Sequence, residues 1–510
     1  MNQWGQESSH CYVAKVCLRL LIDTYTEEFY YAWKEKERNS IREYARDFWA
    51  KHVQTQEEQK VDSLLADLLK TFLGSPEESS TQYRVWTLEI EREYENRPSK
   101  RSPVSYFGLY ALFPVKRSIL AMCYFPFYML LQDWWESAEI HFSEMTDNGQ
   151  NVLCIAAREG NRKICEALIR RGMNVNQPDR LNGSALATAA LAGHLDIVNF
   201  LIEKGSDVNQ ILRAGYQAGD YGSALAAAAY NGHPDIIKIL IEKGSDVNQI
   251  LEAGKFGSAL AAAAVLSKNT EIVRYLIQQG ANVNQFRQAG DFGSALIAAA
   301  NNGHLDTVKC LIEQGANINF QDRRFGSALA AAAAGYESIE KVQYLVEQGA
   351  NVNEILQAGH YGSALAAAAN SGFLDTVKYL VEQGANVNQS LQAGDYGSAL
   401  AAAAAGYGSI EKVQYLVEQG ANVNQILQVG HYGSALAAAA HCNLAATNYE
   451  LAVLEGYRKI EKVQYLVEQG ANVNQSLQAG CYGSALAAAA AGYKNKNMVK
   501  YLIYLGAKED

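Results

Sequence analysis

The sequence predicts an all-α solenoid of helix-turn-helix repeats joined by long hairpin-like loops, preceded by a small helical domain. The motif Gly-Ser-Ala-Leu occurs nine times, at Gly183, Gly222, Gly257, Gly293, Gly326, Gly362, Gly397, Gly433 and Gly483. Seven of the eight steps are 33 to 39 residues long, and the last is 50. A near-constant period in this range indicates one supersecondary unit stacked many times. Each unit buries surface against its neighbours, so 510 residues need no single large core.

The part before the array predicts a few amphipathic helices. Apolar residues at helical spacing predict helices over 10–22, 41–53 and 61–73, the last ended by Gly74-Ser-Pro76. We therefore assign residues 1–97 to an N-terminal helical unit. Residues 98–148 are expected to hold a linker and a degenerate capping repeat, because terminal repeats are usually atypical. In that capping repeat, 102–108 takes the place of the first helix and 128–132 that of the second.

Each full repeat follows the plan of residues 362–396. A short alanine-rich helix begins after Gly362, and Leu374 to Gln383 predicts a second helix. Gly384 is expected to cap that helix, since glycine adopts the left-handed cap conformation most easily. About ten such units fill 149–510. One carries an insertion at 441–454, which we expect to bulge at the turn between its helices or to lengthen its first helix.

These repeats resemble ankyrin repeats. The family's Gly-x-Thr-Pro-Leu-His-x-Ala-Ala core corresponds to Gly-Ser-Ala-Leu-Ala-Ala-Ala-Ala, and its Val-x-x-Leu tail with Gly-Ala-Asn-Val-Asn appears at Val377 to Asn388. The lengthened loop is similar to that of ankyrin arrays from filamentous fungi, which often follow a NACHT-type NTPase module. Residues 10–21 and 44–53 resemble the helical piece that links NTPase and array in those proteins. Ser and Ala replace the family's Thr and His, so we expect alanine packing and backbone contacts to join the repeats.

Composition restricts the partners. The net charge is −10, and the parts before and after residue 149 are each net acidic. Direct nucleic-acid binding and membrane binding are therefore not expected. Eight cysteines without a CxxC pair indicate reduced thiols. No signal peptide is recognisable, and the most apolar window, 118–131, is shorter than the ~20 residues that a membrane span needs, so we expect a cytoplasmic or nuclear protein.

The sequence carries no catalytic motif. Phosphate-binding, nucleophile-elbow and metal-ligand patterns are all absent from it. We therefore expect no enzyme activity, no catalytic residues, no cofactor, no metal site and no small-molecule substrate. His194, His233 and His304 recur at equivalent turns, which indicates a structural ladder rather than a metal site.

The repeats differ from one another most in their loops. The position two before the motif glycine varies in charge and is the first candidate for partner binding: Asp220, Lys255, Asp291, Arg324, His360, Asp395, His431 and Cys481. The residue that follows it is always aromatic, which predicts a ring packed on the neighbouring repeat. The variable positions either contact a partner or drift neutrally. A second candidate row lies at the end of the first helix: Tyr230, Val265, Asn301, Asn370 and His441.

The resemblance implies a non-enzymatic scaffold or adaptor that binds a protein partner through its loops and concave face. A regulatory role, such as a transcription co-regulator, follows by family analogy only. The alternative is a truncated NACHT/ankyrin-type receptor whose array senses a partner and relays the signal to a separate NTPase chain. A decaying gene product is the third possibility; the duplicated stretches favour it, and the intact repeat frame opposes it.

Overall fold

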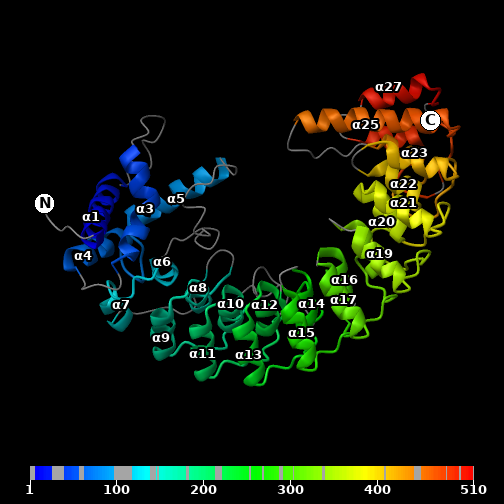
Figure 1. Ribbon diagram of the computed structural model, residues 1–510. Coiled ribbons are helices and arrows are strands. Elements are labelled where there is room, and N and C mark those ends of the chain that lie inside the picture. The colour runs from blue at the N-terminus through cyan, green and yellow to red at the C-terminus, as the bar shows by residue number, and fades with distance from the viewer. Residues whose placement is uncertain are drawn as a thin grey trace. The chain divides into compact units, whose positions relative to one another are not determined.

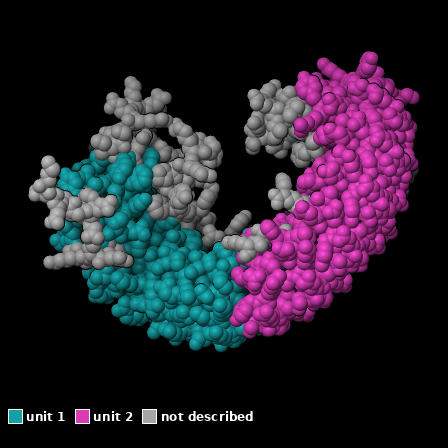
Figure 2. Space-filling view, viewed as in Figure 1, with its two compact units in different colours: residues 1–246 teal, residues 247–510 magenta. Residues whose placement is uncertain are grey.

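In the computed structural model, more than half of the described residues lie in helices. The residues described are 6–25, 40–56, 62–96, 118–137, 145, 149–179, 183–212, 221–251, 254–266, 269–286, 291–302, 304–335, 339–406, 409–441, 449–477, 479–492 and 496–508. The chain forms two compact units, residues 1–246 and 247–510 (Figure 2). The boundary between them runs through the repeat array.

The first unit begins with the predicted helices. Described helices there are α1 (Gln6–Thr24), α3 (Ser40–Gln54), α4 (Ser63–Leu73) and α5 (Thr81–Asn96). The first three confirm the helices expected over 10–22, 41–53 and 61–73, and Gly74 caps α4 with a φ of 101°.

An aromatic cluster forms the centre of this helical part. Trp49 from α3 contacts Phe72 from α4 and Trp86 from α5, with ring centroids 5.0 and 5.6 Å apart in edge-on arrangements. Aromatic rings prefer this geometry, and each contributes a large buried area. Arg46 lies 3.6 Å from Glu89 beside the cluster, and both side chains are buried.

The segment expected to hold the capping repeat contains two described helices. Residues 102–108 are outside the described residues, and α6 (Ser118–Tyr124) takes the first-helix place by packing against the first helix of the next repeat. Residues 128–131 form a turn, so the second helix is α7 (Gln132–Ser137) and not 128–132. The side chain of Asn161 donates to the carbonyls of Cys123 and Tyr124 at 2.9 and 3.1 Å. These bonds join the end of α6 to the following repeat.

Ten pairs of helices follow among the described residues, and in each unit the first helices form one row and the second helices another (Figure 1). The first helices are α8 (Val152–Arg158), α10 (Ala185–Ala192), α12 (Ala224–Asn231), α14 (Ala259–Ala264), α16 (Ala295–Asn302), α18 (Ala328–Ala334), α20 (Ala364–Ser371), α22 (Ala399–Ala405), α24 (Ala435–Ala440) and α26 (Ala485–Ala491). The second helices are α9 (Arg162–Arg170), α11 (Leu195–Glu203), α13 (Pro234–Glu242), α15 (Thr270–Gln278), α17 (Leu305–Glu313), α19 (Ile339–Glu347), α21 (Leu374–Glu382), α23 (Glu411–Glu418), α25 (Tyr449–Glu468) and α27 (Lys496–Tyr504).

The repeated Gly-Ser-Ala-Leu motif starts each first helix. In α20 the side chain of Ser363 accepts a hydrogen bond from the backbone N–H of Ala366 at 3.2 Å, which satisfies one of the free donors at the helix start. The preceding Gly362 has a φ of 75°, and a Cβ there would lie 2.3 Å from the carbonyl oxygen of Ala393 in the next loop. Glycine is therefore required for the loops to stack.

The alanines of the motif form the contact between repeats. In α22, Ala401 to Ala404 are all 0% exposed, because they pack between α20 and α24. Alanine allows helices to approach closely and costs no side-chain entropy. The expectation that alanine packing joins the repeats is confirmed.

A second link between repeats is a polar side chain that reaches the end of the preceding first helix. Nε2 of His194 lies 2.8 Å from the carbonyl oxygen of Arg158, and Nε2 of His233 lies 3.1 Å from that of Leu191. These two histidines have the structural role predicted for them. His304 is exposed.

Buried lysines provide this link in later repeats. Lys412 is 1% exposed, and its ammonium donates to the carbonyl of Ala369 at 2.8 Å. Lys462 is 0% exposed and donates to Ala403 and Gly406 at 3.2 and 2.8 Å. A cation at a helix C-terminus interacts favourably with the helix dipole.

The insertion changes a different helix from the one predicted. The first helix of that repeat, α24, ends at Ala440 and is only six residues long, so the lengthened first helix was wrong. Instead α25 is 20 residues long, and its additional turns come before the part that matches the other second helices. Residues 442–448, where a bulge was expected, lie outside the described residues.

Candidate functional site

The loop tips are fixed by backbone hydrogen bonds between neighbouring repeats. The N–H of His360 donates to the carbonyl of Arg324 at 3.1 Å, that of Asp395 to His360 at 2.8 Å, and that of His431 to Asp395 at 2.8 Å. The N–H of Cys481 continues the series by donating to His431 at 2.8 Å. We call these variable positions the tip row. The backbone therefore holds these tip positions in register, whereas the N–H of Arg324 donates to a side-chain oxygen of Asp322 at 3.0 Å.

The aromatic residues beside the tip row stack on one another. In the second unit, Phe256, Phe292 and Phe325 lie with successive centroids 5.9 and 5.6 Å apart. Tyr361 and Tyr396 continue the pattern at 6.5 Å, with rings inclined by only 15°. Burial raises the pKa of Tyr396, so its phenol stays neutral and packs as part of the stack. These contacts confirm the predicted packing of the rings.

The tip side chains contact each other along the row. A guanidinium nitrogen of Arg324 lies 2.6 Å from a carboxylate oxygen of Asp291. Asp395 lies between two histidines, 3.3 Å from Nδ1 of His360 and 3.5 Å from Nε2 of His431. These pairs are substantially exposed, so each contributes little to stability. The row thus presents polar side chains of differing character to solvent, paired with their neighbours along the row.

The remaining tip residues differ in what the structure shows of them. Lys255 is exposed, and its carbonyl accepts from the N–H groups of Asp291 and Phe292 at 2.9 and 3.0 Å. The thiol of Cys481 is exposed, 3.8 Å from Nδ1 of His431. Asp220 lies outside the described residues.

The residues of the second candidate row are largely buried or in contact with other residues of the array. The ring of Tyr230 lies 4.9 Å from that of Tyr221, and Val265 is 5% exposed. The Asn301 amide donates to the carbonyl of Ala331 at 3.4 Å. Nδ1 of His441 lies 3.2 Å from the carbonyl oxygen of Ala488. Asn370 is half-buried beside the tyrosine stack. This row offers less free surface than the tip row.

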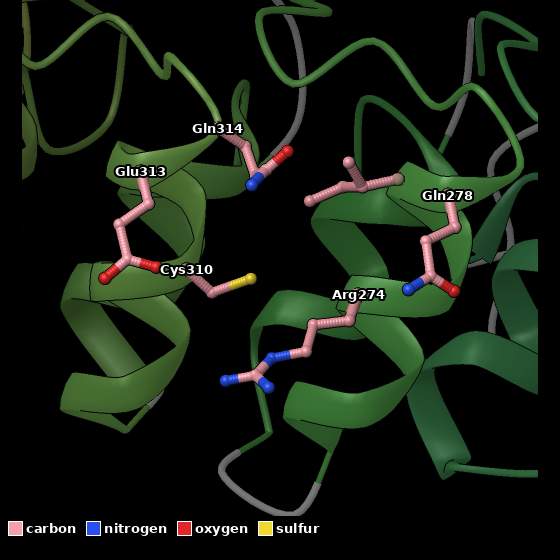
Figure 3. Close-up of a pocket in the computed structure, with 6 residues that line it drawn as sticks. Arg274, Gln278, Cys310, Glu313 and Gln314 are labelled. Atoms are coloured by element: carbon pink, nitrogen blue, oxygen red, sulfur yellow. The ribbon is translucent and has the colours of Figure 1, made fainter.

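A separate pocket of about 290 Å³ lies between α15 and α17. Figure 3 shows Arg274 and Cys310 extending into the space between these helices, with Gln278, Glu313 and Gln314 around them. Burial raises the pKa of the Cys310 thiol despite the nearby guanidinium. The thiol is therefore protonated at neutral pH and is a poor nucleophile.

The described residues contain neither a metal-binding cluster nor a membrane-spanning helix. No group of three or more His, Cys, Asp or Glu side chains among them is placed to hold a metal ion. None of the helices described is long and apolar enough to cross a bilayer.

The sequence reasoning missed two sets of inter-repeat contacts. One is the buried lysines, which occur in the repeats that carry Ile-Glu-Lys-Val at the second helix. The turn of these repeats lacks the Gly-His pair of repeats such as that of Gly193-His194, so the sequence itself shows that the two kinds of repeat differ here. The other is an asparagine ladder. The amide of Asn353 donates to Gly384 at 2.8 Å and its oxygen accepts from the N–H of Asn386 at 2.7 Å. These two hydrogen bonds to the next repeat explain why the asparagine recurs at this position.

Stacked helix pairs with a fixed row of loop tips define a helical repeat solenoid that presents an extended surface. A family model described as "Ankyrin repeats (3 copies)" matches residues 127–212, 210–287, 264–355, 296–391, 329–427 and 364–475. These matches together cover more than half of the chain, which therefore belongs to the ankyrin-repeat family.

Comparison with solved structures finds the human ASB11 ankyrin repeat domain. It is similar at 20% sequence identity with a TM-score of 0.36, over 46% of this chain and 98% of that domain. No curated protein matches the chain.

Proposed function

We propose that this chain is a non-enzymatic scaffold or adaptor that binds a protein partner through its tip row and the adjoining face of the first helices. The observation that carries the proposal is the combination of a fixed backbone and variable side chains. Backbone hydrogen bonds hold His360, Asp395 and His431 in register, while their charges differ from repeat to repeat. Such an arrangement gives specificity through charge pattern and affinity through the area of contact.

The test is affinity capture from the source organism with the full chain. One variant carries Lys255→Ala, Asp291→Ala, Arg324→Ala, His360→Ala and Asp395→Ala. The backbone hydrogen bonds between neighbouring loop tips do not involve these side chains, so we expect an unchanged circular dichroism spectrum. A partner retained by the wild type and lost by the variant supports the proposal. Equal retention by both proteins contradicts it and means that the tip residues drift neutrally.

A second variant controls for the loss of ion pairs. Exchanging the charges as Asp291→Arg with Arg324→Asp keeps a salt bridge of the kind seen at 2.6 Å but reverses its direction on the surface. If the partner reads the charge pattern, this exchange weakens binding although the intramolecular pair is retained.

The finer roles rest on the resemblance alone. A transcription co-regulator predicts that the captured partner is a DNA-binding protein. A truncated receptor predicts that it is an NTPase chain, contacted through residues 10–73. The identity of the partner distinguishes these roles.

A further inference from the structure

One second helix of the second unit lacks an aromatic residue that the other second helices of that unit share. A tyrosine stands at the same place in α15, α19, α21, α23, α25 and α27: Tyr275, Tyr344, Tyr379, Tyr415, Tyr465 and Tyr501. In α17 this place is taken by Cys310. The helices α17 and α21 are otherwise nearly identical, with the sequences Leu-Asp-Thr-Val-Lys-Cys-Leu-Ile-Glu and Leu-Asp-Thr-Val-Lys-Tyr-Leu-Val-Glu. Helix α17 has therefore kept the repeat sequence and lost the ring.

The shared tyrosines lie close to the end of the preceding second helix. Burial raises the pKa of Tyr379, and the carboxylate of Glu347, the last residue of α19, raises it further. Later repeats show the same two causes in the same order for three further pairs: Tyr415 with Glu382, Tyr465 with Glu418, and Tyr501 with Glu468. The phenol of each of these repeats thus lies near the last residue of the second helix before it.

The pocket between α15 and α17 lies where the missing ring would be. It is lined by Cys310 and by Gln278, which is the last residue of α15 and therefore corresponds to Glu347 of α19. Its volume of about 290 Å³ falls below the roughly 300–1,000 Å³ of pockets that hold a drug-sized ligand. The pocket is therefore of a size for a single side chain.

A cation that faces a ring elsewhere in the array is also present here. The ammonium of Lys309 in α17 lies over the ring of Tyr344 in α19, 5.7 Å from its centroid. Arg274 holds in α15 the position that Lys309 holds in α17, and Figure 3 shows its guanidinium extending into the pocket. A guanidinium over an aromatic face is attracted by the ring quadrupole. Helix α15 thus carries the cation for a ring that α17 does not supply.

We propose that this pocket binds a tyrosine side chain of a partner polypeptide, in the place of the ring that α17 lacks. The guanidinium of Arg274 would face the ring, and the amide of Gln278 would accept the phenol proton. Gln278 and Gln314 are exposed at the pocket, and an amide is both donor and acceptor, so they match the peptide groups on either side of the tyrosine. The site lies between second helices and does not depend on the function proposed for the tip row.

Saturation-transfer NMR of the full chain with the peptide Gly-Gly-Tyr-Gly-Gly tests the proposal. Because a single ring supplies most of the contact, we expect a Kd of about 1 mM. The peptide Gly-Gly-Phe-Gly-Gly lacks only the hydroxyl and should bind at least about threefold more weakly. The free phenol p-cresol distinguishes the two sources of such a ring. If p-cresol binds more tightly than the tyrosine peptide, the pocket takes small phenols and the assignment to a polypeptide is wrong.

Two substitutions at one position localise the binding. Cys310→Tyr restores the ring that α21 carries, so this variant should unfold at no lower temperature than the wild type and bind the peptide at least about tenfold more weakly. Cys310→Ser keeps the pocket open and should bind within about twofold of the wild type. The proposal is overturned if the wild type binds no peptide at about 10 mM, if the two peptides bind equally, or if Cys310→Tyr binds as well as the wild type. Unfolding of Cys310→Tyr at a lower temperature would equally overturn it, because the pocket would then not accommodate the ring.

Discussion

Replacing the buried Lys412 should lower the stability of the array where its repeat contacts the preceding one. Lys412 is 1% exposed and its ammonium lies 2.8 Å from the carbonyl of Ala369, in the last turn of α20. Methionine has nearly the same length and fills the same space without the charge. Lys412→Met therefore tests the hydrogen bond and not the packing.

Two opposing free-energy contributions decide how much the Lys412→Met substitution lowers the stability. A hydrogen bond to a charged group contributes about 1.5–3 kcal/mol, and the helix dipole acts on the same ammonium. Against this, burying an ammonium costs several kcal/mol of hydration, which methionine removes. Because the ammonium faces carbonyls at a helix end, we expect the hydrogen bond to dominate and the variant to lose about 2 kcal/mol.

Urea unfolding can localise this effect. All six tryptophans lie within residues 4–135, so their fluorescence reports on the first unit, while circular dichroism reports on the whole chain. With a slope of about 3 kcal/mol per molar, a loss of 2 kcal/mol lowers the dichroism midpoint by about 0.7 M. The fluorescence midpoint should not change.

The control is Lys378→Met on the half-buried Lys378 of α21, which should change stability by less than about 0.5 kcal/mol. If Lys412→Met is as stable as the wild type or more stable, dehydration of the ammonium outweighs its hydrogen bond, and the role assigned to the buried lysines is wrong.

Two other predictions concern glycines and thiols. Gly193 and Gly205 have nearly equal φ values of 88° and 90°, but a Cβ on Gly193 would lie 2.6 Å from Cε1 of His233, whereas Gly205 has nothing within 4 Å. Gly193→Ala should therefore cost more than Gly205→Ala in thermal unfolding, beyond the roughly 1–2 kcal/mol of left-handed strain that both share; equal losses would show that the histidine moves freely. Burial raises the pKa of Cys17 to about 11, so the folded chain keeps this proton where the unfolded chain has lost it, and this thiol makes stability fall as pH rises from about 9 to 11. At pH 8 iodoacetamide should modify the exposed Cys481 well before Cys17, as measured by peptide mass spectrometry, and comparable rates would contradict the burial of α1.

The helix-turn-helix plan of the repeats could be predicted from the sequence because every repeat carries the same pattern. Gly362, Ser363 and the alanines that follow have local roles as a left-handed turn, a helix cap and a close-packed face, so their pattern can be read directly. The stacked rings beside the tips were predictable for the same reason, since an aromatic residue recurs at the same place in every loop.

Features that occur once were harder to predict. The segment before residue 149 has no second copy for comparison, so its sequence does not single out α6 at 118–124. Comparing the repeats shows where the insertion adds residues but not which helix they extend. The ion pairs of the tip row were also missed, because they depend on which charges the backbone ladder brings to neighbouring positions.

The most direct test of the tip row as the binding surface is hydrogen–deuterium exchange of the full chain with and without the captured partner. Binding through the tips predicts that the partner slows exchange in the loops that carry Asp291, Arg324, Asp395 and His431. It predicts no change of exchange rate in the exposed outer face of the second helices. Protection confined to the second helices, or to residues 6–96, would contradict the proposal and place the partner elsewhere on the chain.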